Sequence, residues 1–304
     1  MTELGILGQG PHLVVSPTGE VEVGSGPSTV VDWWVGADDR WHRPSGEAAV
    51  RQAAVAEGAV VETRMRVPGG DVVHRVAVVP SQGSAVGLVE VSNETPVPVA
   101  VALTLKVSAG STHVVEDSVT LNGRPVLRAG RSVARAVAAD TPEHLVATVE
   151  AGRALPPLEA DLPFMAGHGA FIFPVPHSAR LRVVVALDDR LDSLPAPDRL
   201  PGFEDVGRGW MAHLDAGVRI EVPDERLAEA VGAARRHLLV GSGCSVHGPF
   251  WQERTQRWAP AAAAVALSDW GHRDPALDLL IRATDAQHGV GRDRDVETAA
   301  SLLW

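Results

Sequence analysis

The sequence predicts an α+β protein in which an antiparallel β-sandwich comes first and α-helices follow. Three observations predict this order. From His12 to Leu187, apolar residues recur at every second position between closely spaced turn residues. The stretch from Leu194 to Gly202 is rich in proline and cannot join the interior of a sheet. Beyond it the apolar period becomes 3.6. We therefore predict a sandwich domain at 1–192, a Pro-rich linker and connecting segment at 193–222, and helical hairpins at 223–304.

The strand pattern is clearest at 97–107, where Val97, Val99, Val101, Leu103, Leu105 and Val107 fall on one face. Residues 61–67 alternate in the same way. A Pro-Gly-Gly-Asp turn separates them from 72–79 and predicts a hairpin. Asn122-Gly123 predicts a second hairpin, because both residues tolerate positive φ. The last long strand is expected at 180–187. Because no amphipathic crossover helix is evident between the strands, the pattern favours a two-sheet sandwich over a parallel sheet.

The first predicted helix begins at Asp224, its N-cap, and ends at Gly241. Its apolar stripe is expected to consist of Leu227, Val231, Ala234 and Leu238. A second helix is expected at 258–270, with Pro260 in its first turn and Gly271 just beyond its end.

A third helix is expected from Asp274 to about Gly289, with Leu277, Leu280, Ile281 and Thr284 on one face, and a fourth near Asp295. The fourth reaches Trp304 without a capping residue. A few helices with exposed apolar faces do not close a domain. We therefore expect a fragment, apparently truncated within its helical domain; the alternative is that a partner chain or the sandwich covers these faces.

Composition excludes several classes of function. A net charge of −11 with scattered arginines argues against nucleic-acid binding. No leader and no uncharged apolar run of about 18 residues is evident, which predicts a cytoplasmic protein without a membrane partner. Cys244 is the single cysteine, and the histidines lack a helical i, i+4 metal spacing, so no metal site is expected. Gly-Ser-Gly at 241–243 is neither a P-loop nor a dinucleotide fingerprint, and no cofactor is expected.

Tryptophan is plentiful, and tryptophans either fill cores or stack on sugar rings. Trp33 and Trp34 are adjacent on a predicted strand and must point to opposite faces, so at least one packs in the sandwich. We favour structural packing of this segment over ligand contact.

Several segments carry a resemblance to a known family. They are Asp32–His42, Val61–Asp71 and Val89–Pro96, together with the order of sandwich, linker and antiparallel helix pairs. In these features the chain resembles the six-hairpin, or (α/α)6-barrel, glycosidases, particularly the glucoamylase-like and glycogen-debranching proteins of actinobacteria. The resemblance implies an N-terminal antiparallel β-supersandwich followed by the first helices of an (α/α)6 barrel.

The resemblance also implies site residues. Phe250–Trp258 lies where glucoamylase-like enzymes carry a sugar-contacting Trp-x-Arg-Asp segment, which makes Trp251, Arg254 and Trp258 the substrate-binding candidates. Thr255 stands where the aspartate of that segment is expected, which puts sugar contact by this segment in doubt. The segment at 292–300 resembles a loop that lines the open end of the barrel and adds Asp295 and Glu297 as polar candidates.

The function implied is that of a glycoside hydrolase acting on α-glucans or related glycosides, with an oligosaccharide or polysaccharide as partner. Inverting glycosidases need a protonated carboxylic acid and a carboxylate about 6.5 to 9.5 Å apart. The resembled enzymes take both from later barrel helices, so no catalytic residue is identified here and this chain alone is expected to be inactive. The alternative is a non-catalytic carbohydrate-binding or scaffold protein that pairs its helices with another chain.

Overall fold

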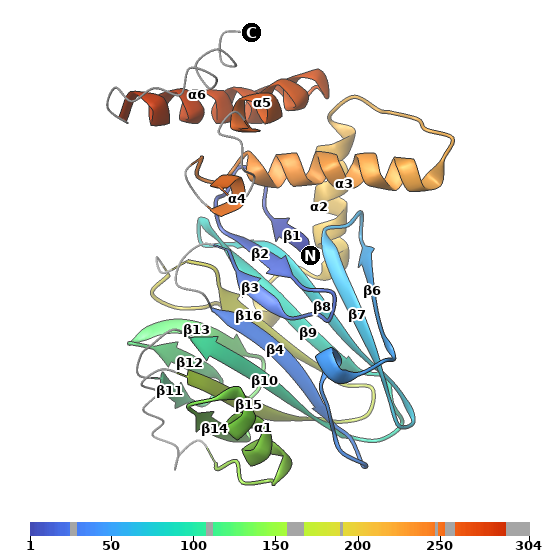
Figure 1. Cartoon of the computed structure of the whole chain (residues 1–304), viewed down its shortest axis with the longest axis vertical. Coiled ribbons are helices and arrows are strands. Elements are labelled where there is room, and N and C mark those ends of the chain that lie inside the picture. Colours follow the sequence, from blue (N-terminus) through green and yellow to red (C-terminus); the bar gives the residue numbers. More distant parts are fainter. Residues whose placement is uncertain are drawn as a thin grey trace.

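Two antiparallel sheets face each other, and a group of helices lies across one end of them (Figure 1). The computed structural model describes residues 1–24, 29–107, 112–156, 167–188, 191–246, 249–252 and 259–289. The predicted α+β class, with an antiparallel sandwich followed by helices, is confirmed.

The first sheet contains the N-terminal strands together with strands from the middle of the sandwich. Across the sheet the order is β1 (Thr2–Gly5), β2 (His12–Val15), β3 (Val21–Val23), β4 (Val30–Gly36), β10 (Val99–Val107), β15 (Gly167–Val175) and β14 (Arg135–Ala139), with β5 (Trp41–His42) paired to β4.

The second sheet lies against the first and is built largely of consecutive hairpins. Its order is β11 (Thr112–Val115), β12 (Ser118–Leu121), β13 (Arg124–Ala129), β16 (Arg180–Ala186), β9 (Ser84–Asn93), β8 (Gly70–Ser81), β7 (Val60–Val67) and β6 (Val50–Val55).

Both predicted hairpins are present. Strands β7 and β8 pair from Val61 opposite Val76 to Val67 opposite Gly70. Asn122 and Gly123 join β12 to β13 with φ values of 52° and 77°, as a two-residue hairpin turn with positive φ requires.

The sandwich core lies between the sheets and contains the predicted face of β10, with Val99, Val101, Leu103 and Leu105 all buried. Trp33 and Trp34 point to opposite faces of β4, as predicted. Trp33 lies in this core, whereas Trp34 packs outside the sheet beneath α1 (Pro142–Glu150). The structure therefore accounts for both indoles by packing.

Helix α1 lies between two strands of the sandwich, and the strand pattern of the sequence did not predict it. Thr141 caps it by accepting a hydrogen bond from the backbone N–H of His144, and Pro142 occupies its first turn. Because α1 joins β14 to β15, which pair antiparallel, it does not introduce a parallel crossover.

The Pro-rich connection packs on the outer face of the second sheet. Leu191 and Leu194 lie in a cluster with Val79 and Leu88 of that face, and Phe203 packs against the same cluster. The segment then forms a helix, α2 (Phe203–Asp215), which begins where Asp205 accepts a hydrogen bond from the N–H of Gly202. The domain boundaries at 192 and 222 stay a prediction.

The remaining helices are α3 (Glu225–Gly241), α4 (Pro249–Gln252), α5 (Ala259–Asp269) and α6 (Arg273–Gly289). Asp224 caps α3 as predicted, since its carboxylate accepts from the N–H of Leu227. None of the described helices is both long enough and apolar enough to span a bilayer.

In two helices the apolar face predicted from the sequence is not the face that is buried. In α3 the buried side chains are Arg235, Leu239 and Val240, while Leu227 is exposed. In α6 the apolar face predicted from the sequence is exposed, and the buried side chains lie on another face. Ala276, Leu279 and Ala283 are buried, whereas Leu277, Leu280 and Ile281 are exposed, Leu277 to 56%. Alanines on both helices let α5 and α6 approach closely.

Candidate functional site

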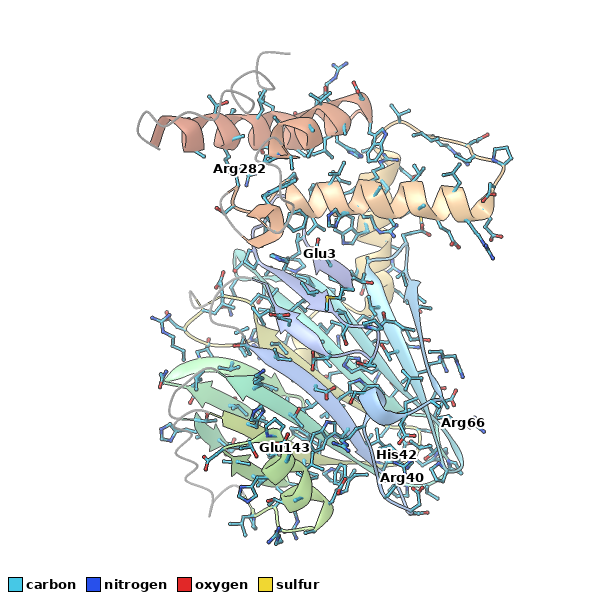
Figure 2. The ribbon with its side chains drawn as sticks, in the orientation of Figure 1. Glu3, Arg40, His42, Arg66, Glu143 and Arg282 are labelled. Carbon is cyan, nitrogen blue, oxygen red and sulfur yellow. The ribbon has the colours of Figure 1, made fainter. Side chains whose placement is uncertain are left out.

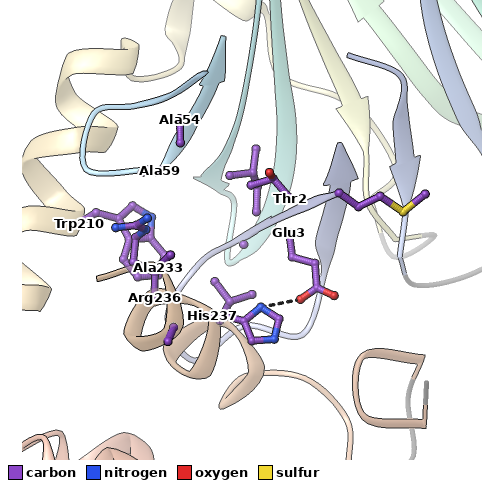
Figure 3. A pocket seen from close by; sticks show the side chains of 14 residues that line it. Thr2, Glu3, Ala54, Ala59, Trp210, Ala233, Arg236 and His237 are labelled. Atoms are coloured by element: carbon purple, nitrogen blue, oxygen red, sulfur yellow. Dashed lines mark ion pairs between the residues drawn. The ribbon is translucent and has the colours of Figure 1, made fainter. Parts of the chain in front are cut away.

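A pocket of about 390 Å³ lies where the sandwich meets the helices, and we call it the junction pocket (Figure 3). It is enclosed by β1, the turn between β6 and β7, α2 and α3. Its lining residues are Met1, Thr2, Glu3, Leu4, Gly5, Ala54, Gly58, Ala59, Trp210, Ala233, Ala234, Arg236, His237 and Val240.

Glycines allow these elements to come together. A Cβ on Gly5 of β1 would lie 2.5 Å from Cγ1 of Val240, so only glycine lets α3 pack this close to the strand. Gly58, in the turn after β6, has φ +74° and faces the guanidinium of Arg236. A side chain there would be strained and would also collide with that guanidinium.

The charged groups of the pocket differ in how they are paired. Glu3 and His237 form an ion pair, with 2.9 Å between Oε2 and Nδ1 (Figure 3). The ring of His237 also stacks on Phe250, with ring centroids 4.9 Å apart. Arg236 forms neither an ion pair nor a hydrogen bond with any side chain in the described ranges. Burial lowers its pKa, and the charge of Glu57 acts in the opposite direction.

The residues that line this pocket are suited to binding a ligand. Hydrolysis of a glycoside by acid–base catalysis needs two carboxyl groups across the scissile bond. Glu3 supplies the one carboxyl group among the lining residues, and it is already paired with His237. Apolar walls with one cation and one imidazole–carboxylate pair can orient a small polar ligand.

The sequence-predicted site residues do not line this pocket. Trp251 lies in α4, is 5% exposed, and packs in a cluster with Phe250, Leu239 and Leu267. Its Nε1–H has no hydrogen-bond partner among the described residues. Arg254, Trp258, Asp295 and Glu297 lie outside the described residues. A sugar-binding role for these five residues stays a prediction.

The site residues predicted from the sequence did not include Glu3, Trp210 or Arg236. Trp210 had a readable signal, because Phe203, Val206, Trp210 and Leu214 follow helical spacing. Glu3 and Arg236 had none: they are far apart in the sequence, and their proximity depends on how β1 docks against α3.

A second cluster of polar groups lies inside the sandwich. The imidazole of His74 stacks on the indole of Trp33, with ring centroids 4.9 Å apart and an interplanar angle of 6°. Gln52 donates to Thr63 Oγ1 at 3.0 Å and to the carbonyl of Ser16 at 2.7 Å. His74 Nδ1 is buried and has no partner among the described residues. Gly19 closes the cluster, because a Cβ there would lie 2.8 Å from Trp33 Nε1. The side chains of this cluster pack tightly against one another, so the cluster supports the fold.

The burial of His74 predicts that the stability of the folded protein falls at acidic pH. Burial lowers its pKa from 6.5 to about 3, so the neutral ring is the folded form. Its contribution to stability is fully present above pH 6.5 and is lost as the pH falls towards 3. The loss approaches about 1.4 kcal/mol per pH unit within this window. His74→Phe keeps a stacked ring that cannot titrate. Urea denaturation at pH 7, 5.5 and 4 should therefore show a smaller fall in unfolding free energy for His74→Phe than for the parent. Equal slopes would contradict this assignment.

A third group of charges lies at the end of the sandwich away from the helices, where Figure 2 labels Arg40 and His42. His42 is buried between Asp39 and Glu47, at 2.9 and 3.0 Å from its two ring nitrogens. A hydrogen bond from His42 lowers the pKa of Asp39, and one from Arg40 lowers that of Glu47. Every charge here has a partner, so the group stabilises the loop around it.

The single cysteine is also structural. Cys244 is buried, with its Sγ 3.8 Å from Nδ1 of His12 and 3.5 Å from the carbonyl oxygen of Gly10. These contacts join β2 to the end of α3. Within the described ranges, no group of three histidine, cysteine or acidic side chains is arranged to hold a metal ion.

The chain was compared with known proteins, and solved structures similar to it were found. No protein-family model matches the chain, and no curated protein matches it. Among solved structures, the chain is similar to one that carries the name kojibiose phosphorylase and comes from the human microbiome. The TM-score is 0.40 and the sequence identity 7%, over 80% of this chain. The chain spans 39% of the length of that structure.

Proposed function

We propose that this chain is the N-terminal part of a glycoside hydrolase of glucoamylase or debranching type, acting on α-glucans or related glycosides. The observation that supports the proposal is the order of an antiparallel sandwich, a docked Pro-rich connection and antiparallel helices. The sequence resemblance implies the same order. Because folds of this kind host more than one activity, the proposal depends on a direct test of glycan binding.

In this proposal the chain contributes binding surface, and the catalytic carboxylates belong to further helices. Among the described residues, Trp251 is packed in the helical cluster. Arg254 and Trp258 of that segment, with Asp295 and Glu297, are the proposed sugar contacts.

Affinity electrophoresis through gels containing glycogen or soluble starch tests the proposal. We expect both polysaccharides to retard the chain, and Arg254→Ala to weaken retardation by about 10-fold or more, as for loss of a charged hydrogen bond. Arg226→Ala, an exposed arginine on α3, is the matched control and should leave retardation unchanged. The chain should release no reducing sugar from either polysaccharide. Unretarded migration in both gels would refute the proposal.

One observation favours the second candidate, a non-catalytic scaffold whose helices pair with another chain. Leu277, Leu280 and Ile281 form an exposed apolar strip on α6, and Val265 of α5 is also exposed. Strips of this kind mark surfaces that other helices cover. Light scattering after size exclusion tests this candidate: a stable dimer that Ile281→Lys converts to a monomer favours pairing, provided that the gels show no glycan binding.

A further inference from the structure

Arg236 is a partly desolvated cation that faces a cavity without an acidic partner. We infer that the junction pocket binds a small ligand through an oxyanion, a carboxylate or a phosphate, which the guanidinium of Arg236 holds. This inference is independent of the proposed glycosidase function.

The position of the guanidinium is built into the chain. The turn after β6 is closed by backbone hydrogen bonds from Gly58 N–H to Val55 O and from Ala59 N–H to Ala56 O, at 3.0 Å each. A Cβ on Gly58 would lie 2.1 Å from Nη2 of Arg236, so the missing side chain makes room for the guanidinium against the turn. A planar donor group held in this way can offer two parallel N–H bonds to an oxyanion.

The charged groups around Arg236 do not engage its guanidinium, which is therefore available to bind a ligand. Glu3 is engaged with His237 at 2.9 Å. Glu57 is close enough to raise the pKa of Arg236 but lies on the exposed turn and forms no ion pair with it. Neighbouring Arg235 instead donates to two carbonyls and an imidazole.

Three arginines on the outer face of the second sheet also differ from Arg236, because a carboxylate lies within 3 Å of each of them. Arg51 contacts Asp71, Arg64 contacts Glu62, and Arg75 contacts Glu62. Burying a cation without a counter-charge is costly, and a bound anion offsets that cost.

The pocket also limits the size and shape of the ligand. Its volume of about 390 Å³ suits a molecule the size of a monosaccharide. Trp210, Ala59 and Val240 supply buried apolar surface, so the ligand is expected to combine an oxyanion with a C–H face. The protein carries a net charge of −11, so an anion is bound by this local arrangement and not by the overall field.

Isothermal titration with inorganic phosphate, glucuronate and neutral glucose tests the inference, at an ionic strength kept constant with NaCl. We expect saturable binding of phosphate, glucuronate or both, and none of glucose. Phosphate alone would identify phosphate esters as the ligand class, and glucuronate alone would identify carboxylates. Constant ionic strength matters because added salt screens the attraction between an anion and the guanidinium.

Three variants assign any binding to Arg236. Arg236→Gln should weaken it by about 10-fold or more, and Arg236→Lys by less, since the charge is kept and the planar fork is lost. Glu57→Gln removes the nearest acid and should tighten binding a few-fold, which tests the inference even if Arg236→Gln fails to fold. Arg226→Gln, exposed on the same helix, is the matched control. The inference is overturned if no oxyanion binds up to about 50 mM, a free energy below about 2 kcal/mol, or if Arg236→Gln and Glu57→Gln both bind like the parent.

Discussion

Replacement of Arg235 by methionine is expected to lower the free energy of unfolding by about 3 to 5 kcal/mol, because three hydrogen bonds from a buried charged donor are lost together. Arg235 is 9% exposed. Its Nε donates to Nε2 of His272 at 2.8 Å, its Nη1 to the carbonyl of Val218 at 3.1 Å, and its Nη2 to the carbonyl of Leu214. It thus connects α3 to the end of α2, to the segment after α2 and to the junction of α5 with α6.

The protonation of His272 fits this role. Burial lowers its pKa, and the charge of Arg235 lowers it further, so the neutral ring can accept the hydrogen bond from Arg235. Methionine preserves much of the apolar stem but leaves the three acceptors without their donor.

Urea denaturation followed by circular dichroism at the helical minimum measures the effect, with Arg226→Met as the control on the exposed side of the same helix. We expect the control to change stability by less than about 0.5 kcal/mol. If the two variants unfold at the same urea concentration, Arg235 does not hold the helices together.

Trp33→Ala is expected to destabilise the sandwich by about 3 to 5 kcal/mol, the cost of removing a large aromatic side chain from a closed core. Trp33 is completely buried between the sheets, its ring stacks on His74, and its Nε1–H donates to the carbonyl of Thr18 at 3.2 Å. Alanine loses the buried surface, the stack and the hydrogen bond together.

Trp33→Phe separates these contributions, since it keeps an apolar ring and removes the N–H. We expect it to cost less than half as much as the alanine change, because the hydrogen bond is worth about 1 kcal/mol. Denaturation monitored by the β-sheet signal of circular dichroism measures both. Equal losses would show that the hydrogen bond, and not the buried surface, dominates at this position.

The strands were readable from sequence because one face of each is buried and period two is unambiguous there. Strand β10 shows this, with alternate valines and leucines in the core, and so does the turn at Asn122 and Gly123, where positive φ is required. Helix α1 was missed because it is short and packs on the outside of a sheet.

Local sequence signals determine where a helix begins, whereas contacts with other elements determine which of its faces is buried. Asp224 at the N-cap of α3 is a local signal, and it correctly predicted where the helix begins. Which face is buried depends on the neighbours, and α6 packs through Ala276 and Ala283 while Leu277 stays outside. The sequence pattern therefore located an apolar face of α6 but did not decide which face is buried.

The sequence by itself determined the β-then-α order, the principal hairpins and the ends of α3, because periodicity, turn chemistry and caps act between residues close together in the chain. Only the tertiary structure decided that Glu3 meets His237 and that Arg236 lies against Gly58. The junction pocket was likewise visible only once the chain was folded. These contacts join segments more than 170 positions apart, and they form because glycines in β1 and in the turn after β6 let α2 and α3 dock against the sandwich.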